Sequence, residues 1–233
     1  MNRLIVTGAS SGIGRAIATR FLVDGWSVLN LSRRPCPDVG VDNLACDLAV
    51  PGALEQCAGA LQEAVAGAER VCLVHNASVM HADRADALEA EHLRAVLELN
   101  LVAAATLNRL LLGRMGAGSS VIYIGSTLAE KAVPGVASYV IAKHALAGMM
   151  RATCQDLAGH GVHTCMICPG FTDTEQLRGV IDGNAETLAA LTGLSAFDRL
   201  IEPEEIAETV AFAAGAPVLN GALIHANLGQ RER

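Results

Sequence analysis

The fold is decided by one stretch near the N-terminus, Thr7-Gly8-Ala9-Ser10-Ser11-Gly12-Ile13-Gly14. It follows a short apolar run, Leu4 to Val6, and leads into the helical pattern of Ile13 to Val23. Glycines between a strand and a helix permit a tight turn and a close approach of phosphate groups, which the free N–H groups of the helix N-terminus attract. Glycines also serve purely structural turns, but this strand–loop–helix context favours a phosphate-binding loop.

Each glycine of this loop has its own expected role. Gly8 permits the turn, Gly12 allows a pyrophosphate to approach, and Gly14 lets the helix pack on the strand. The loop residues expected to contact a dinucleotide are Gly8, Ser10, Ser11, Gly12, Ile13 and Gly14.

Short apolar runs alternate with helical patterns along the rest of the chain. Further strands are expected at Ser27–Leu31, Asn43–Cys46, Val71–Val74, Ser120–Ile124, Val162–Ile167 and Ala222–His225. Helices are expected from about Pro51 and over Glu91–Arg114, Ser138–Gly159 and Pro203–Ala214. This alternation predicts a single α/β domain over residues 1–233, a doubly wound parallel sheet (Rossmann fold) with helices on both faces. The irregular stretch 171–201 is a candidate substrate lid.

Composition excludes several other classes of protein. With 52% apolar residues, a net charge of −7 and only 3% aromatics, the chain has no obvious surface for nucleic acid. The N-terminus does not resemble a secretory signal. The most apolar helical stretch, Leu97 to Leu112, is interrupted by Asn100, Asn108 and Arg109, so we expect no membrane span.

The seven cysteines are scattered and odd in number, which fits reduced thiols and a cytoplasmic protein. Cys165 and Cys168 form a C-x-x-C, a pattern that also occurs in metal and redox sites. They lie on an expected strand, where positions three apart face opposite sides, and no second pair exists. We therefore expect core packing and no metal site.

Four polar residues form a candidate catalytic set. Tyr139 and Lys143 lie at i and i+4 on one expected helix face, although an isolated Tyr-x-x-x-Lys is common by chance. Ser126 ends a strand thirteen residues before Tyr139. Asn100 interrupts a long helix despite its weak helix propensity. In this order, and with the T-G-x-x-x-G-I-G loop, these residues resemble the Asn-Ser-Tyr-Lys tetrad of the short-chain dehydrogenase/reductase family over almost the whole chain.

The resemblance implies an oxidoreductase that moves a hydride between a nicotinamide cofactor and a small carbonyl or alcohol substrate. Hydride delivery to a carbonyl carbon leaves charge on oxygen, which Tyr139 would protonate and Ser126 would hydrogen-bond. A lysine ammonium favours the phenolate of a neighbouring tyrosine. The resemblance also implies that Lys143 holds the nicotinamide ribose and that Asn100 holds a water in a proton relay.

Other cofactor contacts are implied by the same resemblance. Asp47 and Leu48 match the adenine contact, with a turn or helix cap as the alternative for Asp47. Asn76, Ala77 and Ser78 match the adenosine-side loop, where His75 and Ser78 depart from the family's Asn and Gly; His75 is expected to be structural. Pro169, Gly170, Thr172 and Thr174 match the segment that binds the nicotinamide carboxamide, with a plain Pro-Gly turn as the alternative.

The cofactor's phosphate form depends on the end of the second strand. Ser32 occupies the position at which NAD-binding relatives carry an acid, and Arg33 and Arg34 follow it. This pattern favours NADP(H) over NAD(H), unless both arginines are solvated surface charges. Ser11 stands where many NADP-binding relatives carry a basic residue.

Two further expectations concern function and assembly. A non-catalytic nucleotide-binding sensor or scaffold is the alternative, because a fold does not fix a function. The two long expected helices, Glu91–Arg114 and Ser138–Gly159, match those that pair around a two-fold axis in relatives, which predicts a homodimer or homotetramer. The tail from Asn220 to Gly229 departs most from the family, and this puts the tetramer in doubt.

Overall fold

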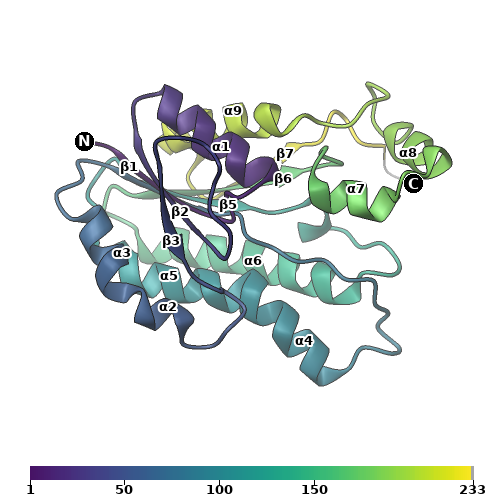
Figure 1. The fold of residues 1–233 in the computed structure, drawn as a ribbon, viewed down its shortest axis with the longest axis horizontal. Helices are drawn as coiled ribbons and strands as arrows, with labels where there is room; N and C mark the ends of the chain where they lie inside the picture. The colour runs from purple at the N-terminus through teal and green to yellow at the C-terminus, as the bar shows by residue number, and fades with distance from the viewer. Residues whose placement is uncertain (232–233) are drawn as a thin grey trace.

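A parallel sheet forms the centre of the computed structural model, which describes residues 1–231 (Figure 1). In the described residues its strands are β1 (Arg3–Thr7), β2 (Ser27–Ser32), β3 (Val41–Ala45), β4 (Val71–His75), β5 (Ser120–Ile124), β6 (His163–Pro169) and β7 (Ala222–Ala226). Their order is β3-β2-β1-β4-β5-β6-β7, and every pair is parallel. The order reverses between β1 and β4, and nucleotides bind at such a crevice in doubly wound sheets.

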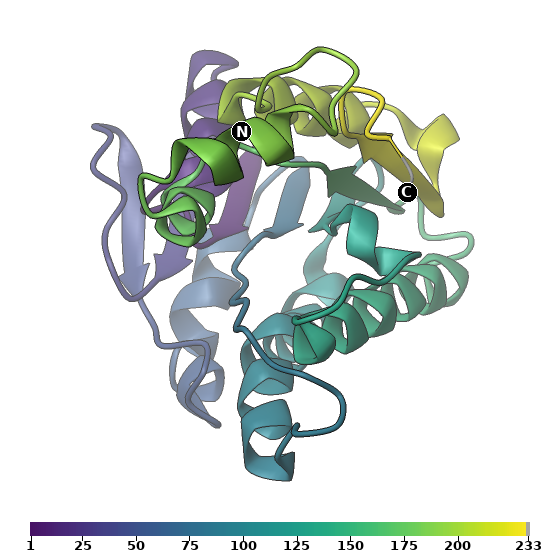
Figure 2. The same cartoon turned by 90° about the vertical axis from the view of Figure 1, so that its right-hand side faces the viewer.

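Helices cover both faces of the sheet (Figures 1 and 2). One face carries α1 (Gly12–Val23) and α9 (Pro203–Ala214). The other carries α2 (Ala53–Gln56), α3 (Ala58–Val65), α4 (Ala90–Leu97), α5 (Ala103–Leu111) and α6 (Ala137–Asp156). Two short helices of the expected lid, α7 (Glu175–Ile181) and α8 (Ala185–Thr192), project beyond the carboxyl ends of the strands. The predicted doubly wound fold is confirmed.

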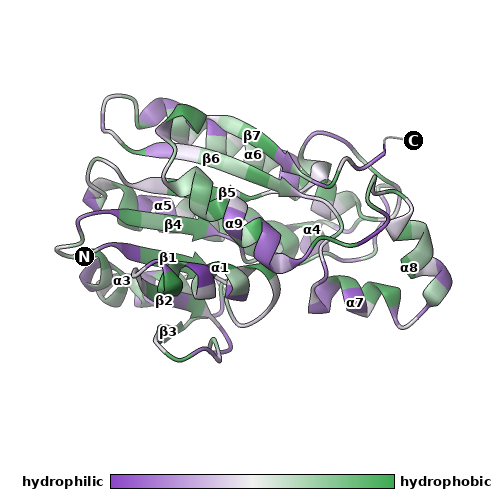
Figure 3. Ribbon diagram, turned by 90° about the horizontal axis from the view of Figure 1, so that it is seen from above, coloured by the Kyte–Doolittle hydropathy of each residue, from purple (hydrophilic) through white to green (hydrophobic). Residues whose placement is uncertain are grey.

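Burial on both faces explains the near-continuous apolar strands. Every residue of β4, β5 and β6 is buried, and Figure 3 shows apolar residues along the middle of the sheet. Successive side chains point to opposite faces. Leu4 therefore packs in the cluster under α1 and α9, whereas Ile5 packs in the cluster against α5 and α6. Cys165 and Cys168 divide between these two clusters in the same way, as predicted.

Several predicted boundaries are wrong. Pro51 is not at a first helical position, because α2 begins at Ala53 after Gly52 turns the chain with φ +83°. The third strand begins at Val41 and ends at Ala45, so it lies earlier than predicted. The long helix expected over Glu91–Arg114 contains a π-helical segment, Glu98–Val102, centred on Asn100.

The expectation that no segment is long and apolar enough for a bilayer is also wrong by length and composition. Among the described residues, the helical run Ala90–Arg114 is long and apolar enough to meet that criterion. Within this run, Asn100 and Asn108 are buried and hydrogen-bonded inside the protein. Since Leu107 and Leu111 are fully buried as well, one side of the run is a wall of the protein core.

Candidate functional site

A cavity of about 800 Å³ lies at the carboxyl ends of the central strands. It brings together nearly all of the residues predicted from the sequence. These are Gly8, Ser10, Ser11, Gly12, Ile13, Gly14, Ser32, Arg33, Arg34, Asp47, Leu48, Asn76, Ala77, Ser78, Ser126, Tyr139, Lys143, Pro169, Gly170, Thr172 and Thr174. Asn100 is the one member of the predicted set that does not line the cavity.

The glycine loop depends on the absence of side chains. Gly8 and Gly12 have φ values of +72° and +54°, a region that glycine adopts without strain. A Cβ on Gly14 would lie 2.4 Å from the carbonyl oxygen of Gly8 and 2.5 Å from Nδ2 of Asn76. Gly14 therefore lets α1 begin directly against the loop and Asn76, rather than against a strand as the sequence suggested.

Two asparagines brace this loop. The Nδ2 group of Asn76 donates to the carbonyl oxygens of Thr7 and Gly8, at 2.9 and 3.2 Å. The backbone N–H of Ala9 donates to Oδ1 of Asn30 at 2.9 Å. Asn30 was missed by the sequence reading, although a lone polar residue inside the apolar strand β2 was an available signal. Because both amides hold the loop, its backbone N–H groups are fixed before any ligand binds.

Tyr139 and Lys143 lie one turn apart on α6, as their spacing predicts. The Lys143 side chain is buried, and its Nζ lies 5.3 Å from the centroid of the Tyr139 ring. The same Nζ donates to the carbonyl oxygen of Ile124 at 2.9 Å. Ser126, just beyond β5, accepts a hydrogen bond on Oγ from the backbone N–H of Leu128 at 3.1 Å. The end of β5 thus fixes both the serine and the lysine.

Asn100 acts on the loop that follows β4. Its Oδ1 accepts from the N–H of Val79, and its Nδ2 donates to the carbonyl oxygen of the same residue, both at 2.8 Å. Both ends of the amide are engaged by the main chain. Its side chain therefore holds the loop after β4 in place, and the predicted role in binding a water stays a prediction.

The predicted residues after β2 and β3 lie beside the cavity and differ in their contacts. Arg33 and Arg34 are exposed beside the cavity, and Arg34 approaches Glu175 of α7 at 3.5 Å. Asp47 also lines the cavity, and its Oδ1 accepts from the N–H of Ala49 at 3.0 Å. The turn-capping alternative for Asp47 is therefore realised, and its place in the cavity leaves Oδ2 for a ligand.

The segment after β6 leads into the candidate lid, residues 171–201. Thr172 is buried and donates to the carbonyl oxygen of Gly170 at 3.1 Å. Thr174 caps α7, because its Oγ1 accepts from the N–H of Leu177 at 3.2 Å. Its threonine hydroxyl proton is still available to a ligand.

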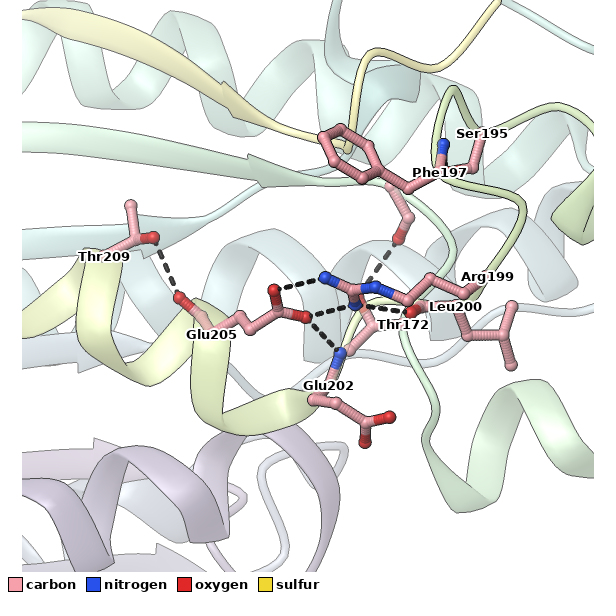
Figure 4. A network of polar contacts seen from close by, with 9 residues as sticks. Thr172, Ser195, Phe197, Arg199, Leu200, Glu202, Glu205 and Thr209 are labelled. Carbon is pink, nitrogen blue, oxygen red and sulfur yellow. Dashed lines mark hydrogen bonds and ion pairs between the residues drawn. The ribbon is translucent and has the colours of Figure 1, made fainter.

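An ion pair ties the end of the lid to α9 (Figure 4). Arg199 donates through Nη1 and Nη2 to the two carboxylate oxygens of Glu205, at 2.6 and 2.8 Å. The backbone N–H of Glu202 donates to the same carboxylate at 2.9 Å. The Arg199 contacts, followed by this N–H, lower the pKa of Glu205 to about 2. Charge-assisted hydrogen bonds thus hold the end of the candidate lid against the start of α9.

His75 is structural, as predicted. Its Nε2 lies 2.9 Å from Oδ1 of Asn108, whose Nδ2 donates to the hydroxyl of Tyr123 at 2.8 Å. Burial lowers the pKa of His75 to about 4, although the bond to Asn108 opposes that shift. The ring is therefore neutral at neutral pH and belongs to a buried polar network rather than to the cavity.

Sequence reasoning missed lining residues from α4, from the segment between β5 and α6, and from the C-terminal tail. They are His92, Leu128, Val133 and Gln230. No motif marks them, because each becomes a neighbour of the cavity only through the folding of distant segments.

Asp83, also unpredicted, links the loop after β4 to the start of α6. Its carboxylate accepts from the N–H of Ser138 at 3.0 Å, from the Ser138 hydroxyl, and contacts Nε2 of His92 at 3.2 Å. Burial raises the pKa of Asp83, but the bonds from Ser138 and His92 outweigh it and hold the pKa below its usual value. The carboxylate therefore stays charged where it caps the helix that carries Tyr139.

Comparisons with known proteins cover nearly the whole chain. The sequence model of a family described as Enoyl-(Acyl carrier protein) reductase matches residues 8–230. Protein FixR of Bradyrhizobium diazoefficiens is 31% identical, over 97% of this chain and 86% of its own length. The 3-oxoacyl-[acyl-carrier-protein] reductase FabG of Vibrio cholerae is 28% identical, over 97% of this chain and 95% of its own length.

A solved structure agrees with these sequence matches. A short chain dehydrogenase from Burkholderia cenocepacia in complex with NADP superposes with a TM-score of 0.87 at 27% identity, and the match covers 98% of this chain and 97% of that one. The matched range contains the glycine loop, the residues at the end of β5 and the Tyr139–Lys143 pair. The chain belongs to the short-chain dehydrogenase/reductase family of oxidoreductases.

Proposed function

We propose that this chain is an NADP(H)-dependent oxidoreductase that interconverts a small carbonyl compound and its alcohol. The observation that carries the proposal is the position of Tyr139, Lys143 and Ser126 in the same cavity as the braced glycine loop. A cavity of about 800 Å³ falls within the range of about 300–1,000 Å³ that small-molecule and cofactor sites occupy.

The residues present fit a dinucleotide. A Cβ on Gly12 would lie 3.2 Å from Cγ2 of Thr174, so a glycine there keeps the passage between loop and lid open. Free N–H groups at the start of α1 would receive the pyrophosphate. When bound, the nicotinamide supplies or takes up the hydride.

The chain's own residues would manage the proton. The Tyr139 hydroxyl donates its proton to the carbonyl oxygen during reduction and takes it back during oxidation. The Ser126 hydroxyl, held by the N–H of Leu128, hydrogen-bonds the same oxygen as its charge develops. The buried ammonium of Lys143 stabilises the phenolate that remains.

The preference for NADP(H) over NAD(H) rests on charge. Ser32 leaves no carboxylate to bind the ribose hydroxyls or repel a 2′-phosphate, and the exposed Arg33 and Arg34 stand beside it. Guanidinium groups bind phosphate through paired hydrogen bonds. The relative from Burkholderia cenocepacia, which holds NADP, supports the same choice.

Location and assembly belong to the same proposal. All seven cysteines are free thiols, which supports a reducing cytoplasmic compartment. The net charge of −7 argues against a nucleic-acid partner. Exposed Val102 and Ile141, on the helices expected to pair, support a homodimer or homotetramer.

The test is turnover of NADPH with a panel of ketones, an acetoacetyl thioester and an enoyl thioester. We expect loss of NADPH absorbance with at least one carbonyl compound and little or none with the enoyl thioester. A nucleotide sensor or scaffold would bind NADPH with similar affinity but oxidise none of it. Binding measured by calorimetry alongside turnover separates these outcomes.

A further inference from the structure

The C-terminal tail forms part of the cavity wall and is tied to the lid. Gln230 lines the same cavity as Tyr139 and Ser126. The N–H of Arg231 donates to the carbonyl oxygen of Leu194 at 2.7 Å, and the N–H of Ala196 donates to that of Leu228 at 3.0 Å. These two bonds fix the backbone on both sides of Gln230.

A tight turn aims the tail toward the loop after β6. The N–H of Gln230 donates to the carbonyl oxygen of Asn227 at 3.1 Å, and Leu228 adopts a left-handed conformation with φ +50°. That conformation is unfavourable for a leucine, so the surrounding contacts impose it. A Cβ on Gly170 would lie 3.1 Å from Oε1 of Gln230, which puts this oxygen directly over the end of β6.

The end of β6 is next to the reacting groups. β5 and β6 are neighbouring strands, paired Ile124 to Ile167, and the N–H of Gly125 donates to the carbonyl oxygen of Ile167 at 2.7 Å. Ser126 follows Gly125 just beyond the end of β5, and neighbouring strands lie about 4.8 Å apart. Gln230 therefore lies at the end of the cavity that holds Ser126 and Tyr139, which is called the hydride-transfer end below. It does not lie near the glycine loop that follows β1.

The amide oxygen of Gln230 has no partner within the described part of the chain. Oε1 is buried and makes no hydrogen bond to any described residue. A buried carbonyl oxygen left unpaired lowers stability, and native proteins satisfy nearly all such groups. Oε1 is enclosed in this conformation, so a donor on a ligand reaches it only when the amide of Gln230, a residue that lines the cavity, turns toward that ligand.

We propose that Gln230 is a ligand-binding residue, a proposal that rests on the proposed function. Its Oε1 accepts a hydrogen bond from an N–H or O–H donor of a ligand at the hydride-transfer end of the cavity. Two bound molecules can present that donor: the carboxamide of the nicotinamide, or a hydroxyl group beside the carbonyl of the substrate. In either case Gln230 favours a ligand that carries a hydrogen-bond donor at this place over one that lacks it.

Gln230→Met removes the acceptor and keeps an unbranched side chain of similar length, and Gln230→Glu keeps an acceptor oxygen. Gln56→Met, on the exposed surface of α2, is the matched control. The binding probes are NADPH and 2′-phospho-ADP-ribose, which lacks the nicotinamide. The substrate probes are hydroxyacetone and butanone, which are similar in size and differ in one hydroxyl group.

If the carboxamide is the donor, Gln230→Met weakens NADPH binding by about 3- to 10-fold and leaves the binding of 2′-phospho-ADP-ribose unchanged. Gln230→Glu, which keeps an acceptor oxygen, then binds NADPH nearly as tightly as the wild type. If a substrate hydroxyl is the donor, the wild-type protein favours hydroxyacetone over butanone in kcat/KM and Gln230→Met abolishes that preference. Equal weakening of both nucleotides, or unchanged NADPH affinity with no wild-type preference for the hydroxyketone, overturns the proposal. A wild-type chain that binds no NADPH would instead contradict the proposed function.

Discussion

The two tyrosines of the chain have different surroundings: Tyr139 lines the cavity, whereas Tyr123 is fully buried. We predict that Tyr139→Phe leaves NADPH affinity unchanged and lowers kcat by about 10² or more, because the proton donor is lost. Steady-state kinetics and calorimetry measure the two effects. Tyr123→Phe is the control and should lower stability, since its hydroxyl bonds Asn108, while turnover persists. Near-normal turnover in Tyr139→Phe would show that another group donates the proton.

Substitution of Arg33 tests whether the protein prefers NADPH to NADH. Arg33→Ala should weaken NADPH binding by about 1.5–3 kcal/mol, the range for hydrogen bonds to charged groups, and NADH binding should barely change. The exposed Arg94 on α4 provides a control substitution away from the cavity wall. Calorimetric titration with both cofactors is the measurement. Equal losses for NADPH and NADH would mean that Arg33 does not bind the 2′-phosphate.

His75 should make stability depend on pH. Because the pKa of His75 falls from 6.5 to about 4 on folding, the unfolded chain binds a proton between those values and the folded protein does not. The free energy of unfolding should be highest above about pH 6.5 and decrease by about 3 kcal/mol as the pH falls to about 4. Urea unfolding of the wild type and His75→Asn measures this component, which the variant should lack. The exposed His160→Asn should retain it.

At the scale of elements, the sequence predicts what periodicity and short motifs determine. The buried strands β4, β5 and β6 are mostly apolar, and the Tyr139–Lys143 spacing defines one helix face, so both were predictable. The π-helical segment at Asn100 was not, because it depends on a bond to Val79 in a distant loop. Gln230 and Asp83 were missed for the same reason: long-range packing gives each its place.

Asp83 connects the loop after β4 to the start of α6, so its substitution should affect both stability and turnover. Asp83→Ala removes the acceptor that caps α6 and should lower the free energy of unfolding by about 1–2 kcal/mol. Turnover should fall as well, with NADPH affinity unchanged, because Tyr139 follows the capped Ser138. Asp86→Asn, an exposed carboxylate of the same loop, is the control. If Asp83→Ala loses stability but keeps its kcat, the cap does not position Tyr139.

At the scale of the whole molecule, exposed apolar side chains on two long helices favour assembly into an oligomer. Val102 and Ile141 are 41% and 43% exposed on the helices expected to pair. We predict that light scattering at micromolar concentration gives at least twice the chain mass of 24.1 kDa. Ile141→Asp should shift the protein toward the monomer, whereas Val39→Asp, on the exposed loop between β2 and β3, should not. A stable, active wild-type monomer would contradict this prediction and leave the proposed chemistry intact.

The bonds between tail and lid have a consequence for how the protein is handled. Since Ala196 and Arg231 join the candidate lid, residues 171–201, to the last described residues, a force applied to the C-terminus would be transmitted to that segment. The N-terminus lies at the opposite end of the sheet, at the start of β1 (Figure 1). We therefore expect a fusion partner at the N-terminus to leave the rate of ligand exchange unchanged and the same partner at the C-terminus to lower it.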